Sequence, residues 1–239
     1  MASRPITALV AALFTTAQNI AALFMGLLFI VMGLTASTIC SANEPIQAKP
    51  LILVLGDSLS ASFGIAQSQG WVSLLQKKLI DSKYSHTVIN ASLSGETTQG
   101  GASRLPALLA KHKPALLILE LGGNDGLRGL PLALIKNSLQ TMISNALKQQ
   151  TQVLLVGMKL PPNYGQTYTE RFHHLYTELA TENNIALVPF LLAGFANDKT
   201  KIQTDGIHPL AIAQPAMLDN VWPYLKTLLP PQQKRHAAK

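Results

Sequence analysis

LILVLGDSLS, residues 51–60, joins an unbroken aliphatic run to a short polar turn. Five successive aliphatic side chains, from Leu51 to Leu55, are typical of a strand that is buried on both faces, as in a parallel sheet. The run ends at Gly56, so Ser58 lies just beyond the carboxyl end of the predicted strand. Ligands of open parallel α/β sheets bind at that edge, and the stretch therefore indicates both a fold and the place of a site.

Outward from this stretch, apolar runs alternate with amphipathic segments along the chain. The short apolar runs predict further strands at residues 87–91, 115–121, 153–158 and 186–189. Apolar side chains at helical spacing predict helices at residues 71–80, 105–110, 132–149, 169–183 and 213–228, the last of them frayed by Pro215 and Pro223. The alternation predicts a single α/β domain over residues 51–229, a three-layer α/β/α arrangement with a flavodoxin-like five-stranded parallel sheet.

Polar blocks rich in turn residues follow the first, second, third and fifth predicted strands. They are GDSLS at 56–60, NASLSG at 90–95, GGND at 122–125 and DGIHP at 205–209. Because the carboxyl ends of parallel strands meet at one edge of a sheet, the four blocks are expected to converge. Between them they hold a serine, a glycine, an asparagine and an Asp-x-x-His pair, which are the parts of a serine hydrolase.

Each of these residue types has a definite task in acyl transfer. The hydroxyl of Ser58 is a weak nucleophile until a neighbouring imidazole takes its proton, and His208 is the candidate base. A carboxylate on the other ring nitrogen holds the imidazole in one tautomer, and Asp205 lies three residues before His208. The tetrahedral oxyanion needs hydrogen-bond donors, which the backbone at Gly95 and the side-chain amide of Asn124 can supply.

Taken singly, each residue also has an ordinary structural interpretation. Ser58 fits a helix N-cap, Asn124 fits a glycine-rich turn, and His208 fits a loop histidine before a proline. One shared site explains all of them at once, which separate structural roles do not. The Gly-x-Ser-x-Gly elbow of α/β-hydrolases is absent because residue 60 is a serine. Arg104 and Glu120, which flank the blocks, are interpreted as structural.

The chain resembles the SGNH (GDSL) hydrolase family, and in particular its periplasmic acyl-CoA thioesterase, lysophospholipase and arylesterase branch. The resemblance covers residues 51–228 and is carried by LILVLGDSLSASFGI, NASLSGETTQGGASRLPALL, ELGGNDGLRGL, LPPNYG and DGIHPLAIAQP. It implies the SGNH hydrolase fold, with Ser58 as nucleophile, His208 as base and Asp205 as the residue that orients the base. It also implies that the oxyanion binds the N–H groups of Ser58 and Gly95 and the amide of Asn124.

The resemblance implies a serine esterase that hydrolyses acyl esters and thioesters through an acyl-serine intermediate. The implied substrates are fatty acyl-CoA, lysophospholipids, and aryl or short-chain esters. Apolar loop residues after the third and fourth strands are the expected walls of an acyl groove: Leu127, Leu130, Leu160, Pro161, Pro162 and Tyr164. Two alternatives stay open. A carbohydrate O-deacetylase on the same fold uses the same residues with a more polar platform, and a non-catalytic flavodoxin-like ligand-binding module needs neither Asp205 nor His208.

The N-terminal segment has the pattern of an export signal. Its first 42 residues carry one charged side chain, Arg4, ahead of a long apolar stretch that ends in small residues. This pattern predicts a signal peptide over residues 1–42, cleaved after residue 42 for export to the periplasm, and a linker over residues 43–50. An uncleaved anchor is the alternative, although the strongest apolar run is shorter than the ~20 residues that span a bilayer. Ile39 disfavours a lipidated Cys40, because the residue before a lipidated cysteine is small.

The charge pattern argues against a nucleic-acid partner. The net charge is +7, from 19 Lys and Arg against 12 Asp and Glu, and the basic residues are scattered. No metal or nucleotide motif is present and Cys40 is the only cysteine, so we expect no metal, no cofactor and no disulfide in the exported chain. We expect a monomer that takes a small-molecule or lipid acyl substrate, is not stably inserted in a membrane after signal removal, and ends in a polar tail at residues 230–239.

Overall fold

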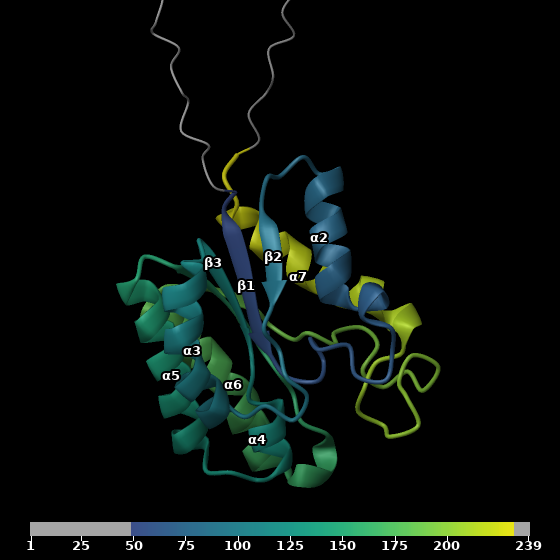
Figure 1. Ribbon diagram of the computed structural model, residues 1–239. Coiled ribbons are helices and arrows are strands. Elements are labelled where there is room, and N and C mark those ends of the chain that lie inside the picture. The colour runs from purple at the N-terminus through teal and green to yellow at the C-terminus, as the bar shows by residue number, and fades with distance from the viewer. Residues whose placement is uncertain (1–48, 232–239) are drawn as a thin grey trace, which may run out of the picture. The chain divides into compact units, whose positions relative to one another are not determined.

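The computed structural model describes residues 49–231, and its centre is a five-stranded sheet (Figure 1). The predicted signal peptide, most of the predicted linker and all but two residues of the predicted tail lie outside the described residues. The strands are β1 (Leu51–Gly56), β2 (Thr87–Asn90), β3 (Leu116–Glu120), β4 (Gln152–Val156) and β5 (Ala186–Val188). Every neighbouring pair is parallel and the order is β2-β1-β3-β4-β5, so the predicted flavodoxin-like sheet is confirmed.

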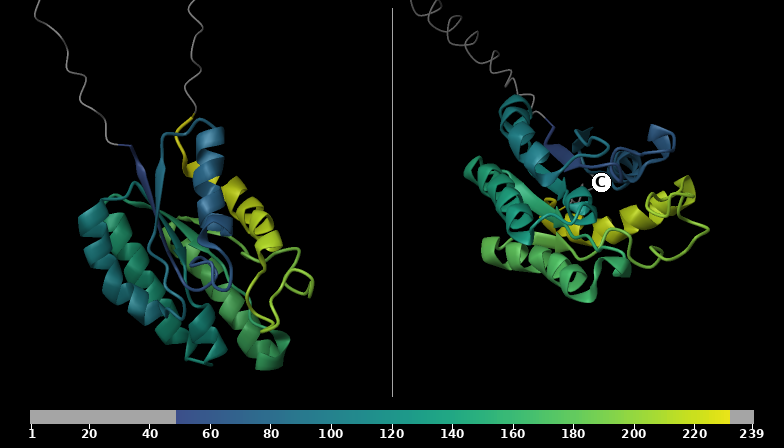
Figure 2. Two further views of the ribbon diagram at one scale, coloured as in Figure 1. Left: turned by 45° about the vertical axis from the view of Figure 1, so that its right-hand side comes forward. Right: turned by 90° about the horizontal axis from the view of Figure 1, so that it is seen from below.

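Helices cover both faces of this sheet, which completes the predicted three-layer arrangement (Figure 2). On one face α2 packs against α7, and on the other α3, α5 and α6 lie side by side. The helices are α2 (Trp71–Asp81), α3 (Thr98–His112), α4 (Gly123–Leu127), α5 (Leu132–Lys148), α6 (Gln166–Asn183) and α7 (Gln214–Leu228). Within residues 49–231, none of them combines the length and apolar character needed to cross a membrane.

The interior of the domain is built from the aliphatic runs that predict its strands. In β1 the side chains of residues 52–55 are fully buried, and every residue of β3 is buried. Helix α2 buries Trp71, Val72, Leu75 and Leu79, whose spacing places them on one face of the helix. Because β1 and β3 are covered on both faces, their carboxyl ends are held firmly and position the residues that follow.

Helix α3 is longer than the predicted segment at residues 105–110. It begins at Thr98, and Thr97 caps it by accepting a hydrogen bond from the Gly100 N–H at 3.1 Å. Two glycines and a proline disfavour this helix in the sequence. Gly101, however, lies so close to the segment after β3 that an added Cβ would stand 2.4 Å from the Leu121 side chain. Close packing therefore decides where α3 begins.

The predicted fraying of α7 is wrong, because the helix runs without interruption from Gln214 to Leu228. Pro215 lies in the first turn, where backbone N–H groups have no helical acceptor, and Pro223 lies on the exposed face.

The five-residue helix α4 is a second difference from the prediction. Its sequence, Gly-Asn-Asp-Gly-Leu, is typical of a turn, and the helix carries Asn124.

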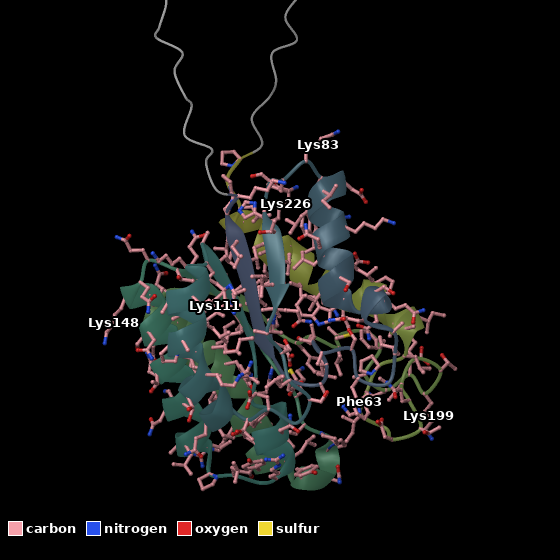
Figure 3. All side chains as sticks on the ribbon, viewed as in Figure 1. Phe63, Lys83, Lys111, Lys148, Lys199 and Lys226 are labelled. Atoms are coloured by element: carbon pink, nitrogen blue, oxygen red, sulfur yellow. The ribbon has the colours of Figure 1, made fainter. Side chains whose placement is uncertain are left out.

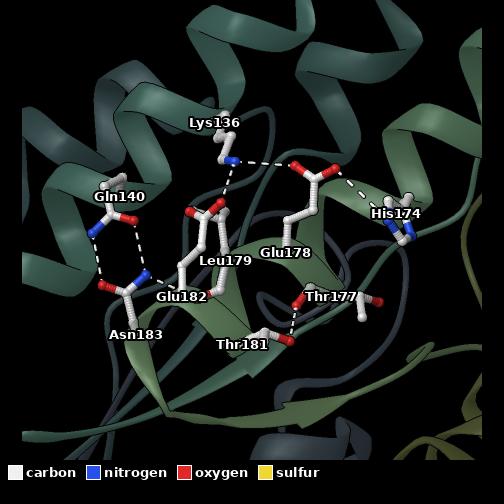
Figure 4. A network of polar contacts seen from close by, with 9 residues as sticks. All are labelled: Lys136, Gln140, His174, Thr177, Glu178, Leu179, Thr181, Glu182 and Asn183. Atoms are coloured by element: carbon white, nitrogen blue, oxygen red, sulfur yellow. Dashed lines mark hydrogen bonds and ion pairs between the residues drawn. The ribbon is translucent and has the colours of Figure 1, made fainter.

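Polar side chains tie α5 to α6 on the outer surface (Figure 4). Lys136 Nζ lies 3.0 Å from a Glu178 carboxylate oxygen and 2.7 Å from a Glu182 carboxylate oxygen. Gln140 and Asn183 exchange two hydrogen bonds of 2.7 and 2.8 Å. Exposed ion pairs contribute only about 0–1 kcal/mol each, so these contacts align the two helices more than they stabilise the domain.

The lysine side chains are spread over the surface of the domain. Lys83 and Lys226 lie near the top of the view, Lys148 at its left and Lys199 at its right (Figure 3). The labelled lysines therefore do not form a single basic stripe. The expected absence of a nucleic-acid site stays a prediction.

Candidate active site

Ser58 lies in a tight turn directly after β1. The carbonyl oxygen of Asp57 accepts a hydrogen bond from the Ala61 N–H at 2.9 Å, and that of Ser58 accepts one from the Phe63 N–H at 3.2 Å. Glycine is required where the strand meets this turn, because a Cβ at Gly56 would stand 2.4 Å from a carboxyl oxygen of Glu120. The turn leaves Ser58 half-buried at the edge of a cavity.

Three side chains from distant parts of the chain form a hydrogen-bonded series at this turn. His208 Nε2 lies 2.8 Å from Ser58 Oγ, and His208 Nδ1 lies 2.6 Å from Asp205 Oδ2. In this order the imidazole can accept the hydroxyl proton while the carboxylate holds the ring in one tautomer. The structure therefore brings together the three residues that the sequence singles out as nucleophile, base and orienting acid.

Asp205 is held by the backbone as well as by the His208 ring. Its Oδ1 atom accepts hydrogen bonds from the N–H groups of Ile207 at 2.9 Å and His208 at 3.0 Å, and Gly206 makes the turn with a φ of 74°. Burial by itself raises the pKa of this carboxyl group, but the hydrogen bonds outweigh that effect and lower the pKa of Asp205 from 3.8 to about 2. Asp205 is therefore an anion at neutral pH and complements a protonated imidazole.

Phe63 and Gln203 also belong to the site, although the sequence analysis assigns no role to either of them. The Phe63 ring lies against the His208 ring, with centroids 4.4 Å apart and planes tilted by 37°. Gln203 Nε2 donates to the Phe63 carbonyl oxygen at 2.9 Å, and the Gln203 N–H donates to the His208 carbonyl oxygen at 2.7 Å. These contacts join the nucleophile turn to the loop that carries the imidazole.

Asn124 joins the loops that follow three different strands. It lies in the first turn of α4, lines the cavity, and donates through Nδ2 to the Glu96 carbonyl oxygen at 3.0 Å and to Asp57 Oδ2 at 3.2 Å. Arg104 forms an ion pair with Glu96, in keeping with its structural interpretation. Gly95, next to Glu96, is exposed with a φ of 79°, and it does not line the cavity.

The candidate oxyanion donors differ in whether their N–H groups already have a hydrogen-bond acceptor. Among the described residues, the N–H groups of Ser58 and Gly95 donate no hydrogen bond. N–H groups without an acceptor are what a developing oxyanion requires. Both protons of the Asn124 amide, in contrast, already have acceptors. The amide must therefore give up one of these bonds, or share it, before it can bind an oxyanion.

A cavity of about 1100 Å³ opens beside Ser58. Four of the six predicted groove residues line it, namely Leu127, Leu160, Pro161 and Pro162. The other two do not, because Leu130 packs against the core and Tyr164 lies in a short 3₁₀ turn beyond the lining. The sequence analysis misses a second wall. It is formed by residues 188–190, which begin at the last residue of β5, by residues 192–198, and by Asn220 and Tyr224 of α7.

Attack by a serine hydroxyl with help from an imidazole is the chemistry that this geometry permits, so the fold and the site together define a candidate serine hydrolase. Comparison with family models makes the assignment specific. Residues 54–213 match the GDSL-like Lipase/Acylhydrolase family, and the chain belongs to this family.

Relatives of known name support the same assignment. The chain is 52% identical to Esterase TesA of Pseudomonas aeruginosa over 182 residues, which are 76% of this chain and 90% of that protein. It is 42% identical to Thioesterase 1/protease 1/lysophospholipase L1 of Escherichia coli K12 over 172 residues, 72% of this chain and 81% of that protein. A crystal structure of TesA superposes with a TM-score of 0.74 at 52% identity, covering 75% of this chain and 99% of that one. The resemblance and the SGNH fold inferred from the sequence are confirmed.

Proposed function

We propose that this hydrolase cleaves acyl esters and thioesters through an acyl-serine intermediate, with Ser58 as nucleophile, His208 as general base and Asp205 as the orienting acid. The observation that carries the proposal is the series of hydrogen bonds, 2.8 and 2.6 Å long, that links these side chains beside the cavity. Membership of the lipase/acylhydrolase family supports it, as do relatives named as an esterase and a thioesterase.

The proposed reaction has two halves that use the same imidazole. His208 Nε2 accepts the hydroxyl proton while Ser58 Oγ attacks the acyl carbon, and it then gives that proton to the departing alcohol or thiol. In the second half His208 takes a proton from water, whose oxygen attacks the acyl carbon. The carboxylic acid leaves as Ser58 Oγ regains a proton. Asp205 remains ionised throughout and stabilises the imidazolium.

We assign oxyanion binding to the N–H groups of Ser58 and Gly95 and to the amide of Asn124. The first two donors have no competing partner within the described residues. Asn124 would exchange its longer bond, 3.2 Å to Asp57, for the oxyanion, while the 3.0 Å bond to the Glu96 carbonyl oxygen keeps the amide in place. The two backbone N–H groups, which need break no hydrogen bond, can stabilise the transition state without such an exchange.

The cavity walls favour an acyl chain over a sugar. Leu127, Leu160 and two prolines form one wall, and Phe190 and Phe195 contribute to the other. The volume, about 1100 Å³, is slightly larger than that of most small-molecule sites and leaves room for a fatty acyl group. We therefore propose fatty acyl thioesters, lysophospholipids, and aryl or short-chain esters as substrates, in preference to an acetylated carbohydrate.

The Leu160→Ser variant tests the acyl site. We expect kcat/KM on p-nitrophenyl decanoate to fall about five- to tenfold, because a buried methylene contributes ~0.8 kcal/mol and Leu160 removes part of the chain from water. The value for p-nitrophenyl acetate should change less than about twofold, since an acetyl group has no chain to bury. The measurement is a panel of p-nitrophenyl esters of increasing length, acyl-CoAs and lysophosphatidylcholine.

The matched control for this panel is Leu134→Ser, because Leu134 is 57% exposed on α5 and does not line the cavity. Its chain-length profile should match that of the wild type. Equal losses on acetate and decanoate in the Leu160→Ser variant would contradict the proposed acyl site. Preferential turnover of an acetylated sugar by the wild type would instead favour an O-deacetylase.

We further propose that the chain is exported to the periplasm, cleaved after residue 42 and monomeric when mature. The support is the sequence pattern of residues 1–42, which lie outside the described residues. N-terminal sequencing of protein from a periplasmic fraction should begin at Asn43, and gel filtration should give the mass of one chain. A start at Met1, or a lipid on Cys40, would contradict this processing.

A further inference from the structure

Glu120 lies beneath the nucleophile turn and takes no part in the mechanism above. It ends β3, where the parallel register places it opposite Gly56, and its side chain is completely buried. Its Oε2 atom forms hydrogen bonds with the Ser60 hydroxyl at 2.5 Å and with the Asp57 N–H at 3.3 Å. These partners stand on either side of Ser58, so a single carboxyl group holds both ends of the segment that contains the nucleophile.

The surroundings of Glu120 supply no compensating positive charge. In the part of the chain that the structure describes, no lysine or arginine forms an ion pair with it. Its second oxygen, Oε1, is buried without a hydrogen-bond partner. Burial, and to a smaller extent the neighbouring carboxyl group of Asp57, raise the pKa of Glu120 well above its usual range. An unpaired carboxylate costs several kcal/mol to bury, so these surroundings favour the neutral carboxylic acid.

We propose that Glu120 is a positioning residue that works as a neutral carboxylic acid, holding the nucleophile turn so that the hydroxyl and N–H of Ser58 face the substrate. The inference rests on the proposed role of Ser58 as the nucleophile. A negative charge on Glu120 would repel the carboxyl group of Asp57, which accepts hydrogen bonds from the Leu59 N–H at 3.0 Å and from Asn124 at 3.2 Å. The turn and the amide at the oxyanion site would then shift together.

The titratable groups that face this pair of carboxyl groups come from several elements. They are Asp57 after β1, Asp125 in α4, Tyr176 in α6 and His208 on the loop before α7. Burial raises the pKa of Asp57 to about 6, and it also raises the pKa of Tyr176 well above its usual range. His208 is the only base in this group. A neutral replacement at Glu120 therefore removes one titrating proton and leaves the other groups in place.

The kinetic test compares Glu120→Gln, a neutral isostere that keeps an acceptor, with Glu120→Met, which has a similar size but no hydrogen bond. On p-nitrophenyl butyrate we expect kcat of the Gln variant to stay within about threefold of the wild type. For the Met variant we expect kcat to fall about ten- to hundredfold with KM nearly unchanged, because a displaced nucleophile loses its alignment. The rate at which a fluorophosphonate labels Ser58 should fall in the same ratio.

Two kinetic results would overturn the inference. Labelling and turnover at the wild-type rate in the Glu120→Met variant, even with a lower melting temperature, would make Glu120 merely structural. A Glu120→Gln variant as slow as the Met variant would mean that the carboxylate charge is required. The Ser58→Ala variant separates this inference from the proposed function. Persistent turnover in that variant would show that Ser58 is not the nucleophile, which would refute the proposed function and not only the role of Glu120.

Protonation of Glu120 is tested by stability, which does not depend on activity or on the folding of the Met variant. The folded protein keeps a proton that the unfolded chain releases near the usual pKa of 4.5. The stabilisation from this proton is complete below that pH and is lost as the pH rises toward the higher folded pKa. As the pH rises from the usual pKa toward the higher folded pKa, the folding constant of the Glu120→Gln variant relative to the wild type should therefore rise, by at most about tenfold per pH unit. A ratio that stays constant over this range would overturn the inference.

Discussion

Replacement of Ser58 by alanine is expected to lower kcat on p-nitrophenyl butyrate by about four to six orders of magnitude. Without the hydroxyl group no acyl-serine forms, and the imidazole 2.8 Å away has no proton to accept from it. The His208→Ala variant should lose a similar factor for the converse reason. The double variant should be no slower than the slower single variant, because residues that act as a unit do not contribute additively.

The control for this result is a thermal melt, together with labelling by a fluorophosphonate. Ser58 is half-buried and its truncation removes one oxygen, so the melting temperature should change by only about a few degrees. Labelling should disappear in the Ser58→Ala variant. Asp205→Ala should retain about ten- to hundredfold more activity than Ser58→Ala, because nucleophile and base both remain. Wild-type turnover by the Ser58→Ala variant would refute the proposed mechanism and support the non-catalytic alternative.

Loss of the Asn124 amide should be the next most damaging change at the site. We expect Asn124→Ala to lower kcat on the same ester by about 10²- to 10³-fold, equivalent to ~3–4 kcal/mol, with little change in KM. The effect falls on kcat because the donor meets the tetrahedral oxygen of the transition state rather than the carbonyl oxygen of the bound ester. Steady-state kinetics with one aryl ester measure it.

The Asn124→Ala variant also loses two structural contacts, so a matched control is needed. Thr98→Val removes another tie to α4, the 2.7 Å bond from the Thr98 hydroxyl to Asp125, and leaves the Asn124 amide in place. Its kcat should stay within about threefold of the wild type. Unchanged kcat with a raised KM in Asn124→Ala would place the residue in ordinary substrate binding. Simple unfolding of that variant would favour a structural role in holding the glycine-rich turn.

The strands follow from the sequence to within one or two residues, whereas several helices do not. Strand β1 is an unbroken aliphatic run because both faces of the central sheet are covered, and that pattern is local. The beginning of α3 depends on the close approach of Gly101 to Leu121, which lies across the fold. Helix α7 likewise continues through Pro223, which lies on its exposed side. Which side of the helix is exposed is decided by how the helix packs.

The sequence by itself determined that a polar block follows each of four strands. Because the carboxyl ends of parallel strands lie at one edge of the sheet, it also determined that Ser58, Asp205 and His208 lie close together there. Tertiary structure alone decided what surrounds them: Phe63 against the imidazole, the second cavity wall after β5, and the occupied amide of Asn124. The placement of Glu120 below the nucleophile turn belongs with these features. The physical reason is that strand ends converge through a regular, local pattern, whereas contacts between loops depend on side chains far apart in the chain and leave no periodic signal in it.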